Sequence, residues 1–285
     1  MGGSGWRPQR GTDKRQLSEA RLQAHYAVQW LARTARAYIQ PQPDDGHTSL
    51  LWDRSLDGLM TQALPDGTRL SLQIADLTLA WHDGTRAGPV QSFCLNTQPD
   101  TQARQWLGAQ LAARNLDARA LDAASPYPLP AHAIAQGAVY DAAGCADALA
   151  ALAAWYGNAE LLLSGVQSQM LERKLAASPV CCWPHHFDLA TLITLPGRNS
   201  DLTGYVGVGL SPGDDYYDEP YYYVSVYPRP DAAALPSLPA LGFWHTHEFT
   251  AAVSPAHRIV AAKDQDSETN DFLRGSVAVA IKLLS

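Results

Sequence analysis

Hydrophobic and polar positions follow two different periodicities along the chain, and each predicts a type of element. Between residues 17 and 38, apolar side chains recur at steps of three and four, which predicts an amphipathic helix that ends before Pro41. Between 70 and 96, apolar residues alternate with polar ones around a His-Asp-Gly turn, which predicts antiparallel strands. Asp100 is expected to cap a further helix over 101–114.

The same order of elements is expected again after residue 125. Alternating prolines within 125–130 indicate an extended linker, and a helical pattern over 141–176 follows, with a break expected at Gly157 or Gly165. Strands are then predicted over 180–195, 204–210, 221–227 and 241–249, and closing helices near Ser254 and Ser267. The predicted organisation is a flexible lead over 1–12, a helix–strands–helix unit over 13–124, and a helical segment with a C-terminal sheet over 125–285.

Strands joined by short turns, with helices placed before and after them, are typical of an α+β fold. We therefore expect mainly antiparallel sheets with long flanking helices. Because both parts of the chain show a helix, then strands, then a helix, the two halves are expected to be similar.

The composition is that of an ordinary soluble globular protein, and it argues against several classes. The 285 residues are 46% hydrophobic and 17% charged, with a formal net charge of −7. A negative chain without a block of basic residues is not expected to bind nucleic acid, and no apolar run predicts a membrane span. The lack of an apolar leader and of Cys-x-x-Cys spacing favours the cytoplasm, and the scarcity of lysine favours a bacterial source.

Two histidine-bearing stretches could carry chemistry. On a strand, His245 and His247 would point to one side, a spacing that can hold a divalent metal such as zinc or manganese. His186 and Asp188 have the same spacing and could complete the ligand set, with Asp188 as the base that activates a metal-bound water. The alternative is that these histidines lie at strand edges or beside core aromatic residues, with Asp188 accepting ordinary hydrogen bonds.

Aromatic residues near these stretches suggest a ligand-binding wall. Tyr221 and Tyr223 would share one face of a strand, and Trp183 and Trp244 belong to the histidine-bearing stretches. Phenol rings offer a large contact area with polar tips, which suits a pocket or an interface, although an aromatic core is an equal alternative. The acidic stretch before Tyr221 is expected to be a solvated loop, because its carboxylates lack the spacing of a calcium-binding loop.

Other metal and nucleotide motifs fit less well. No glycine-rich phosphate-binding loop opens a helix. The stretch from His245 resembles the His-[Ser/Thr]-His motif of the JAMM metalloproteases, but Ser254 stands one position early and His257 replaces the aspartate ligand. The cupin motif also fails, because Glu248 directly follows His247.

Three ordered motifs in the C-terminal half resemble a family of uncharacterised bacterial proteins defined by a domain of unknown function. They are Trp183 with Phe-Asp-Leu-Ala at 187–190, Gly-Leu-Ser-Pro-Gly at 209–213, and Glu-Pro-Tyr-Tyr-Tyr-Val at 219–224. The resemblance covers roughly residues 178–250. It implies an α+β bacterial cytoplasmic protein, and it favours a pocket built on Trp183, Asp188 and the tyrosines.

These observations lead to one hypothesis and one alternative. The hypothesis is a C-terminal aromatic and histidine pocket for a small-molecule ligand, with a divalent metal and metal-assisted hydrolysis if the protein is an enzyme. The alternative is a noncatalytic interaction protein that forms a homodimer through its tyrosine-rich strand, 221–227.

Overall fold

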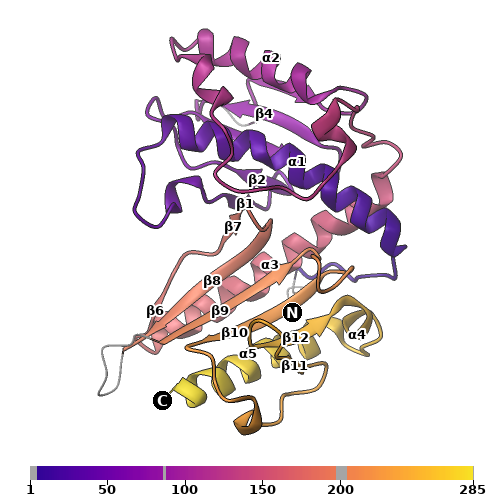
Figure 1. Cartoon of the computed structure of the whole chain (residues 1–285), viewed down its shortest axis with the longest axis vertical. Coiled ribbons are helices and arrows are strands. Elements are labelled where there is room, and N and C mark those ends of the chain that lie inside the picture. The colour runs from indigo at the N-terminus through magenta and orange to yellow at the C-terminus, as the bar shows by residue number, and fades with distance from the viewer. Residues whose placement is uncertain (1–4, 86–87, 197–203, 285) are drawn as a thin grey trace. The chain divides into compact units, whose positions relative to one another are not determined.

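The computed structural model describes residues 5–85, 88–196 and 204–284, and contacts divide the chain into two units. Unit 1 contains the described residues within Met1–Gly11, Ala154–Cys181 and Asp188–Ser285, and unit 2 contains those within Thr12–Ala153 and Cys182–Phe187. The chain, drawn in Figure 1, therefore passes between the units four times. Because the long stretch of unit 2 ends at residue 153, the division differs from the boundary expected at residue 125.

The proline-rich stretch expected as a linker lies inside unit 2. Tyr127 within it donates a hydrogen bond from its hydroxyl to Gln29 Oε1 at 2.9 Å. The Tyr127 ring also contacts His185, with 5.6 Å between the ring centroids. These contacts hold the stretch against its own unit, which explains why alternating prolines do not mark a boundary here.

The expected flexible lead over 1–12 is in part a structured segment of unit 1, and residues 1–4 lie outside the described residues. The backbone N–H of Arg7 donates to Asn158 Oδ1 at 2.8 Å, and the Asn158 amide donates back to the carbonyl of Arg7. Gln9 is buried and exchanges two similar bonds with Gln265. These paired bonds satisfy backbone groups of an extended segment that has no strand partner, and they attach it to unit 1.

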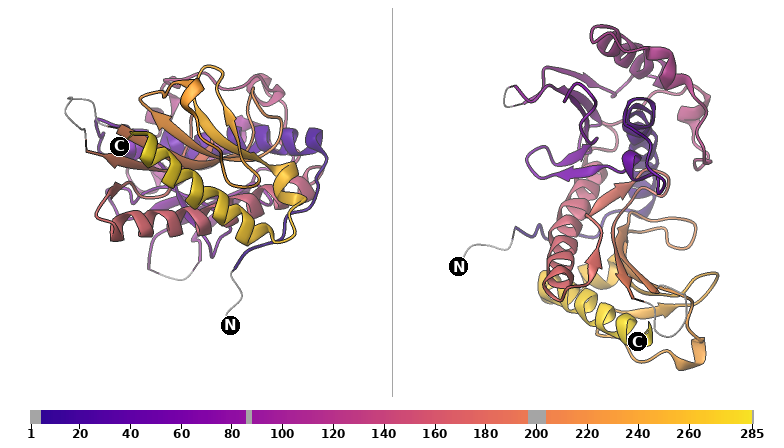
Figure 2. Two further views of the ribbon diagram at one scale, coloured as in Figure 1. Left: turned by 90° about the horizontal axis from the view of Figure 1, so that it is seen from below. Right: turned by 90° about the vertical axis from the view of Figure 1, so that its left-hand side faces the viewer.

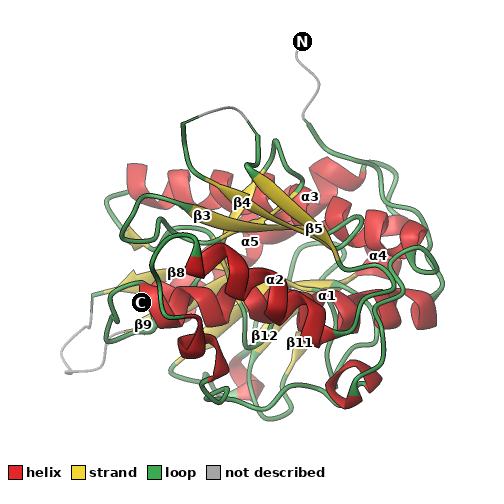
Figure 3. Cartoon of the chain, turned by 90° about the horizontal axis from the view of Figure 1, so that it is seen from above, coloured by secondary structure: helices red, strands yellow, loops and turns green. Residues whose placement is uncertain are grey.

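Unit 2 contains two helices and a five-stranded antiparallel sheet. The helices are α1 (Lys14–Tyr38) and α2 (Asp100–Ala112), and α3 (Ala146–Glu172) begins in this unit. The strands are β1 (Leu51–Asp53), β2 (Gly58–Met60), β3 (Arg69–Gln73), β4 (Thr78–His82) and β5 (Gln91–Cys94). They pair in chain order, and Figure 3 shows β3, β4 and β5 side by side. The predicted helix and hairpins are confirmed, whereas the short strands β1 and β2 were not predicted.

The helix over 101–114 is present, but its expected cap is wrong. Pro99 occupies the N-cap position, and Asp100 is the first helical residue. The carboxylate of Asp100 instead accepts hydrogen bonds from Trp30 Nε1 and from the Tyr140 hydroxyl, both at 2.8 Å. The Asp100 side chain therefore makes tertiary hydrogen bonds and does not cap the helix as the local sequence predicted.

Unit 1 consists of a second antiparallel sheet with helices along one side. Its strands are β6 (Ala176–Ala177), β8 (Asp188–Leu195), β9 (Gly204–Ser211), β10 (Tyr221–Tyr227), β11 (Phe243–His245) and β12 (Ala251–Pro255). The strand order is β11-β12-β10-β9-β8-β6. The chain passes between the units within β7 (Cys181–Trp183), and α4 (Ala256–Val260) and α5 (Gln265–Leu284) complete unit 1.

The two faces of this sheet differ in character. One face, here called the core face, carries Leu189, Val208, Tyr222 and Val224, which are fully buried. It packs against α5 and, through the contact of Trp155 with Tyr222, against α3; Figure 2 shows both helices on that side. The opposite face, here called the tyrosine face, carries Asp188, Gly207, Gly209, Tyr221, Tyr223, Val253, Phe243 and His245.

Helix α3 is continuous through Gly157 and Gly165, so the predicted break is wrong. A side chain at Gly157 would place its Cβ 2.1 Å from the guanidinium of Arg7. That atom is the far end of a flexible side chain and can move, so this contact does not require glycine. The packing of α3 in unit 1 offsets the cost of glycine within a helix.

These elements establish an α+β fold with antiparallel sheets and long flanking helices, as the sequence predicted. The expected similarity of the two halves does not extend to strand order, because unit 2 pairs its strands consecutively while β12 inserts beside β10 in unit 1. No helix among the described residues has both the length and the apolar character needed to cross a membrane.

A buried histidine in α1 holds the turn that lies between β7 and β8. His25 Nε2 lies 2.9 Å from the carbonyl oxygen of Pro184, which also accepts from Gln29 Nε2 at 2.8 Å. The His25 ring stacks on Phe187. Burial lowers the pKa of His25 to about 4, so the ring is neutral at pH 7 and donates its Nε2 proton to Pro184.

This contact predicts acid sensitivity in a defined window. The unfolded chain protonates His25 near pH 6.5, and the folded chain only near pH 4. The free energy of unfolding should therefore fall as the pH drops from 6.5 to 4, by about 3 kcal/mol when the drop is complete. Urea unfolding of His25→Gln should lack this component, while the exposed His186→Gln in the same unit should keep it. An unchanged pH profile in His25→Gln would contradict the assignment.

Candidate functional site

The tyrosine face carries a hydrogen bond that spans three strands. The Tyr223 hydroxyl on β10 donates to Asp188 Oδ2 on β8 at 2.5 Å. The strand between them, β9, has Gly209 directly opposite Tyr223. The Tyr223 ring therefore lies over Gly209 to reach the carboxylate.

Gly209 is required for that arrangement. A Cβ at this position would lie 2.6 Å from Tyr223 Cζ and 2.8 Å from the carbonyl oxygen of Leu189. Neither neighbour can move easily, because one belongs to a rigid ring and the other to the backbone. Glycine in a strand interior marks a close approach of this kind.

A second tyrosine–carboxylate pair lies beside the first. Tyr221 donates its hydroxyl to Asp214 Oδ2 at 2.5 Å, and the backbone N–H groups of Tyr216 and Tyr217 donate to Asp214 Oδ1 at 2.9 and 3.1 Å. The ring centroids of Tyr221 and Tyr223 are 6.2 Å apart. Asp214 therefore holds the acidic stretch against the sheet. The sequence predicted a solvated loop here and did not predict this contact.

The pKa values of both sheet tyrosines are displaced upwards. Burial raises the pKa of Tyr223, and the neighbouring Asp188 carboxylate raises it further. Burial and Asp214 raise the pKa of Tyr221 in the same way. Both phenols therefore remain protonated donors at neutral pH, because a phenolate beside a carboxylate would bring two negative charges together.

His245 is held by bonds to both of its ring nitrogens. Nδ1 lies 2.9 Å from the Tyr217 hydroxyl, and Nε2 lies 2.7 Å from the carbonyl oxygen of His247. A carbonyl can only accept, so the neutral ring carries its proton on Nε2 and accepts from Tyr217 at Nδ1. The ring also stacks on Phe249, with 4.2 Å between centroids. His245 is therefore a part of the aromatic packing with no ring nitrogen left over for another partner.

Tyr216 completes the outer side of this cluster. Its hydroxyl donates to the carboxylate of Glu248, and the side chain is 41% exposed. Its ring stands nearly perpendicular to His245 and Phe249, at interplanar angles of 79° and 77°. We refer to Tyr216, Tyr217, Tyr221, Phe243, His245 and Phe249, with Asp214 and Glu248, as the aromatic–acid cluster.

The structure does not bring Asp188 to the His245–His247 pair. Three strands, β9, β10 and β12, lie between β8 and β11 in the sheet. Adjacent strands lie about 4.8 Å apart, so these four spacings place the two backbones roughly 19 Å apart. Ligands of one zinc ion lie about 2 Å from it. The prediction that Asp188 shares a metal, or activates its water, at His245 and His247 is therefore wrong.

The predicted strand over 241–249 is also shorter than expected. Strand β11 ends at His245, and Glu248 has a φ angle of 61°, in the left-handed region that a strand does not use. His247 consequently lies beyond the strand, and strand alternation does not align it with His245. Trp244 points to the opposite side of β11, where its Nε1 donates to the carbonyl of Pro236 at 2.7 Å.

Trp183 and His186 belong to unit 2, as part of the segment Cys182–Phe187. The single strand predicted over 180–195 is interrupted there, because Phe187 has a φ angle of 58° and its N–H donates to the carbonyl of Trp183 at 2.7 Å. The rings of His186 and Trp183 both contact His185. Tyr221 and Tyr223 are thus the predicted ligand-binding residues that the structure places together with Asp188.

Among residues 5–85, 88–196 and 204–284, no group of three or more His, Cys, Asp or Glu side chains is placed to hold a metal ion. Two open cavities of about 400 and 560 Å³ lie in unit 1 beside α4 and α5. They share Ala262 and Lys263, and neither is lined by a residue that the sequence singled out. The predicted site is therefore a surface of the sheet and not one of these cavities.

A Gly-x-Ser-x-Gly pattern at 209–213 was missed by the sequence analysis, and it is typical of serine hydrolases when a helix follows the serine. Here Ser211 ends β9, and a loop leads to β10. The Ser211 hydroxyl accepts from the N–H of Gly213 at 3.2 Å and is buried. The pattern therefore forms a strand end beside Tyr221, without the geometry of a nucleophile.

Comparisons with protein-family models, with curated proteins and with solved structures found no match to this chain.

The role of Gly209 can be tested with a matched pair of substitutions. Gly209→Ala should lower the free energy of unfolding by about 1–3 kcal/mol, because its Cβ meets backbone and ring atoms. Gly207→Ala, two residues earlier on the same face, should change it by less than about 1 kcal/mol, because the nearest atom is the rotatable Ser225 Oγ. Equal effects in urea unfolding would contradict this account.

The Tyr223–Asp188 bond can be tested against the adjacent tyrosine. Tyr223→Phe removes the hydroxyl that donates to Asp188 Oδ2 and should lower the free energy of unfolding by about 2 kcal/mol. Tyr222→Phe should be neutral or stabilising, because the buried Tyr222 hydroxyl has no hydrogen-bond partner among the described residues. Urea unfolding compares the two, and a larger loss in Tyr222→Phe would refute the proposed bond.

Proposed function

We propose that the protein binds a small ligand on the tyrosine face of unit 1. The observation that carries the proposal is the Tyr223–Asp188 bond across Gly209. Burying part of the Asp188 carboxylate and the Tyr223 hydroxyl, and placing Gly209 inside a strand, each lower the stability of the fold. None of the three residues contributes to the core on the opposite face of the sheet. Exceptions to local packing rules of this kind concentrate at functional sites.

The aromatic–acid cluster supports the same proposal. It lies at one side of the tyrosine face, and its rings combine large apolar area with polar tips, as small-molecule sites do. Tyr223 is half-buried and Tyr216 exposed, so a ligand would reach ring surface without unfolding the sheet. Asp188 takes part in this proposal as a binding and orienting group.

The alternative is an interaction protein that forms a homodimer through its tyrosine-rich strand. Strand β10 lies between β9 and β12, and both its sides are hydrogen-bonded, so it would contribute through its face and not as an edge. Its face remains available for a homodimer. Leu192 is 43% exposed and Tyr227 is 59% exposed on that face, and exposed apolar side chains favour such contacts.

A divalent metal at His245 and His247 is retained as a further hypothesis. Both ring nitrogens of His245 already have partners within the chain, so metal binding requires the bond to Tyr217 or to the His247 carbonyl to break. Metal-assisted hydrolysis would require one of these two hydrogen bonds to break first, so that the metal can bind. The bacterial source, the cytoplasmic location and the resemblance to a bacterial family of unknown function are proposals supported by composition and motifs.

One titration tests these functions together. The labelled full chain is titrated with choline, with its neutral isostere 3,3-dimethylbutan-1-ol, with benzoate and with zinc chloride, while backbone NMR signals are followed. We expect at least one organic probe to shift signals of β9, β10 and β12 saturably. Failure of all three organic probes would contradict the proposed function. Zinc-dependent shifts at His245 and His247 that vanish in His245→Ala would establish the metal hypothesis.

A further inference from the structure

We propose that the ligand of the aromatic–acid cluster is a small organic cation, such as an alkylammonium group. This inference rests on the proposed function and specifies its ligand class. Three features of the cluster carry it, namely the arrangement of its rings, the charge of its polar groups, and the direction of its hydrogen bonds.

The rings of the cluster pack against one another and leave Tyr216 exposed at their outer side. Tyr216 stands nearly perpendicular to both His245 and Phe249, with centroid distances of 5.2 and 5.3 Å, and is 41% exposed. His245 and Phe249 are stacked on each other, so Tyr216 contacts both rings. A cation placed over an aromatic face is attracted by the ring quadrupole, and alkylammonium groups are recognised in this way.

The protein already places one cation on this cluster. The guanidinium of Arg258 lies over the Phe243 ring, 4.8 Å from its centroid. Among the described residues, no lysine or arginine lies over Tyr216. The exposed ring of Tyr216 therefore offers a comparable surface that a ligand can occupy.

The charge of the cluster is negative and is not balanced by salt bridges. Within the described part of the chain, neither Asp214 nor Glu248 pairs with a lysine or arginine side chain. The nearby Arg229 donates to the backbone carbonyls of Thr246 and Glu248 and not to a carboxylate. A cationic ligand would give these carboxylates the ion pair that Arg229 and Arg258 do not make with them.

The hydrogen bonds of the cluster disfavour an anion. The hydroxyls of Tyr216, Tyr217 and Tyr221 all donate to acceptors within the cluster, namely Glu248, His245 and Asp214. The Nε2 proton of His245 is given to the His247 carbonyl. The groups of the cluster can therefore offer a ligand oxygen lone pairs as hydrogen-bond acceptors. An anion needs hydrogen-bond donors, so it would bind less well than a cation.

The test compares ligands of one shape and different charge. Choline and 3,3-dimethylbutan-1-ol differ only in the replacement of the ammonium nitrogen by carbon. Titration calorimetry of the full chain should give choline an affinity about tenfold higher than the alcohol, and benzoate should bind more weakly than either. Tighter binding of the alcohol or of benzoate would overturn the cation proposal and leave the proposed function standing. Absence of binding by all three would overturn both.

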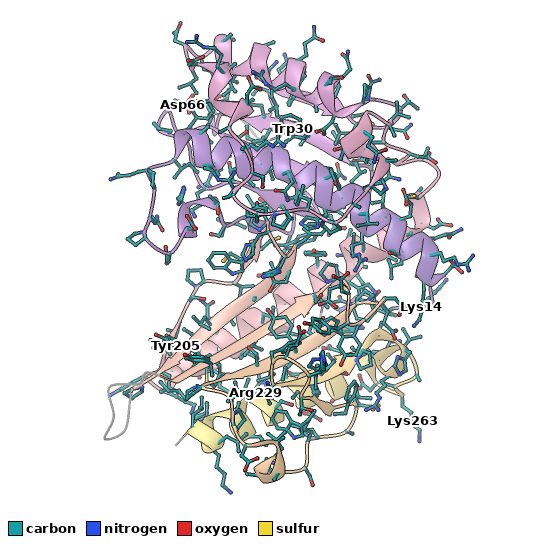
Figure 4. All side chains as sticks on the ribbon, viewed as in Figure 1. Lys14, Trp30, Asp66, Tyr205, Arg229 and Lys263 are labelled. Atoms are coloured by element: carbon teal, nitrogen blue, oxygen red, sulfur yellow. The ribbon has the colours of Figure 1, made fainter. Side chains whose placement is uncertain are left out.

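Variants then locate the site. Tyr216→Leu removes the exposed ring, and Glu248→Gln removes a charge while keeping an oxygen for Tyr216; each should weaken choline binding several-fold. Tyr205→Leu, at the start of β9 and labelled in Figure 4, is the matched control and should leave choline binding unchanged. Melting temperatures confirm that the variants are folded. Unchanged choline affinity in both Tyr216→Leu and Glu248→Gln would overturn the location.

Discussion

The Tyr223–Asp188 hydrogen bond shows most directly how unit 1 is organised. It is possible because the sheet buries most of its aliphatic side chains on the core face, under α3 and α5. The other face combines a smaller buried cluster of Tyr221, Ala251 and Val253 with polar groups. Gly209 removes the one Cβ that would block the ring, and the carboxylate then receives a donor across two strand spacings. A buried carboxylate without such a donor would destabilise the sheet.

In the aromatic–acid cluster, too, each hydrogen-bond donor of the ring side chains has an acceptor within unit 1. Each tyrosine hydroxyl donates to an acidic or imidazole side chain, and the carbonyl of His247 determines which nitrogen of His245 carries the proton. The donor and acceptor roles of these groups are therefore linked, because a hydroxyl or ring nitrogen that donates to one neighbour is not available to another.

In unit 2, a pairing of buried donors with one acceptor stabilises the fold. The turn at 184–187 contributes one carbonyl, of Pro184, and two buried side chains of α1 donate to it. His25 lies within the amphipathic helix that the sequence predicts, and no local pattern sets it apart from its neighbours. Its importance follows from a partner 159 residues away, which no local pattern reveals.

Sequence periodicity predicted the elements whose environment is uniform. The helix α1, the hairpin strands β3 and β4 and the strand β10 follow from spacing alone, because one side of each is buried along its length. Periodicity failed where a single residue changes the backbone direction. Glu248 and Phe187 adopt left-handed conformations that ended two predicted strands and removed the expected alignment of His245 with His247.

The sequence by itself determined the fold class and the face on which Tyr221 and Tyr223 lie, because these depend on local alternation and on the total apolar content. Only the tertiary structure decided which side chains meet. The order of strands separated Asp188 from His245, and the close approach of Tyr223 to Gly209 joined it to Asp188. Those outcomes depend on the pairing of distant segments, and that information is not contained in the spacing of neighbouring residues.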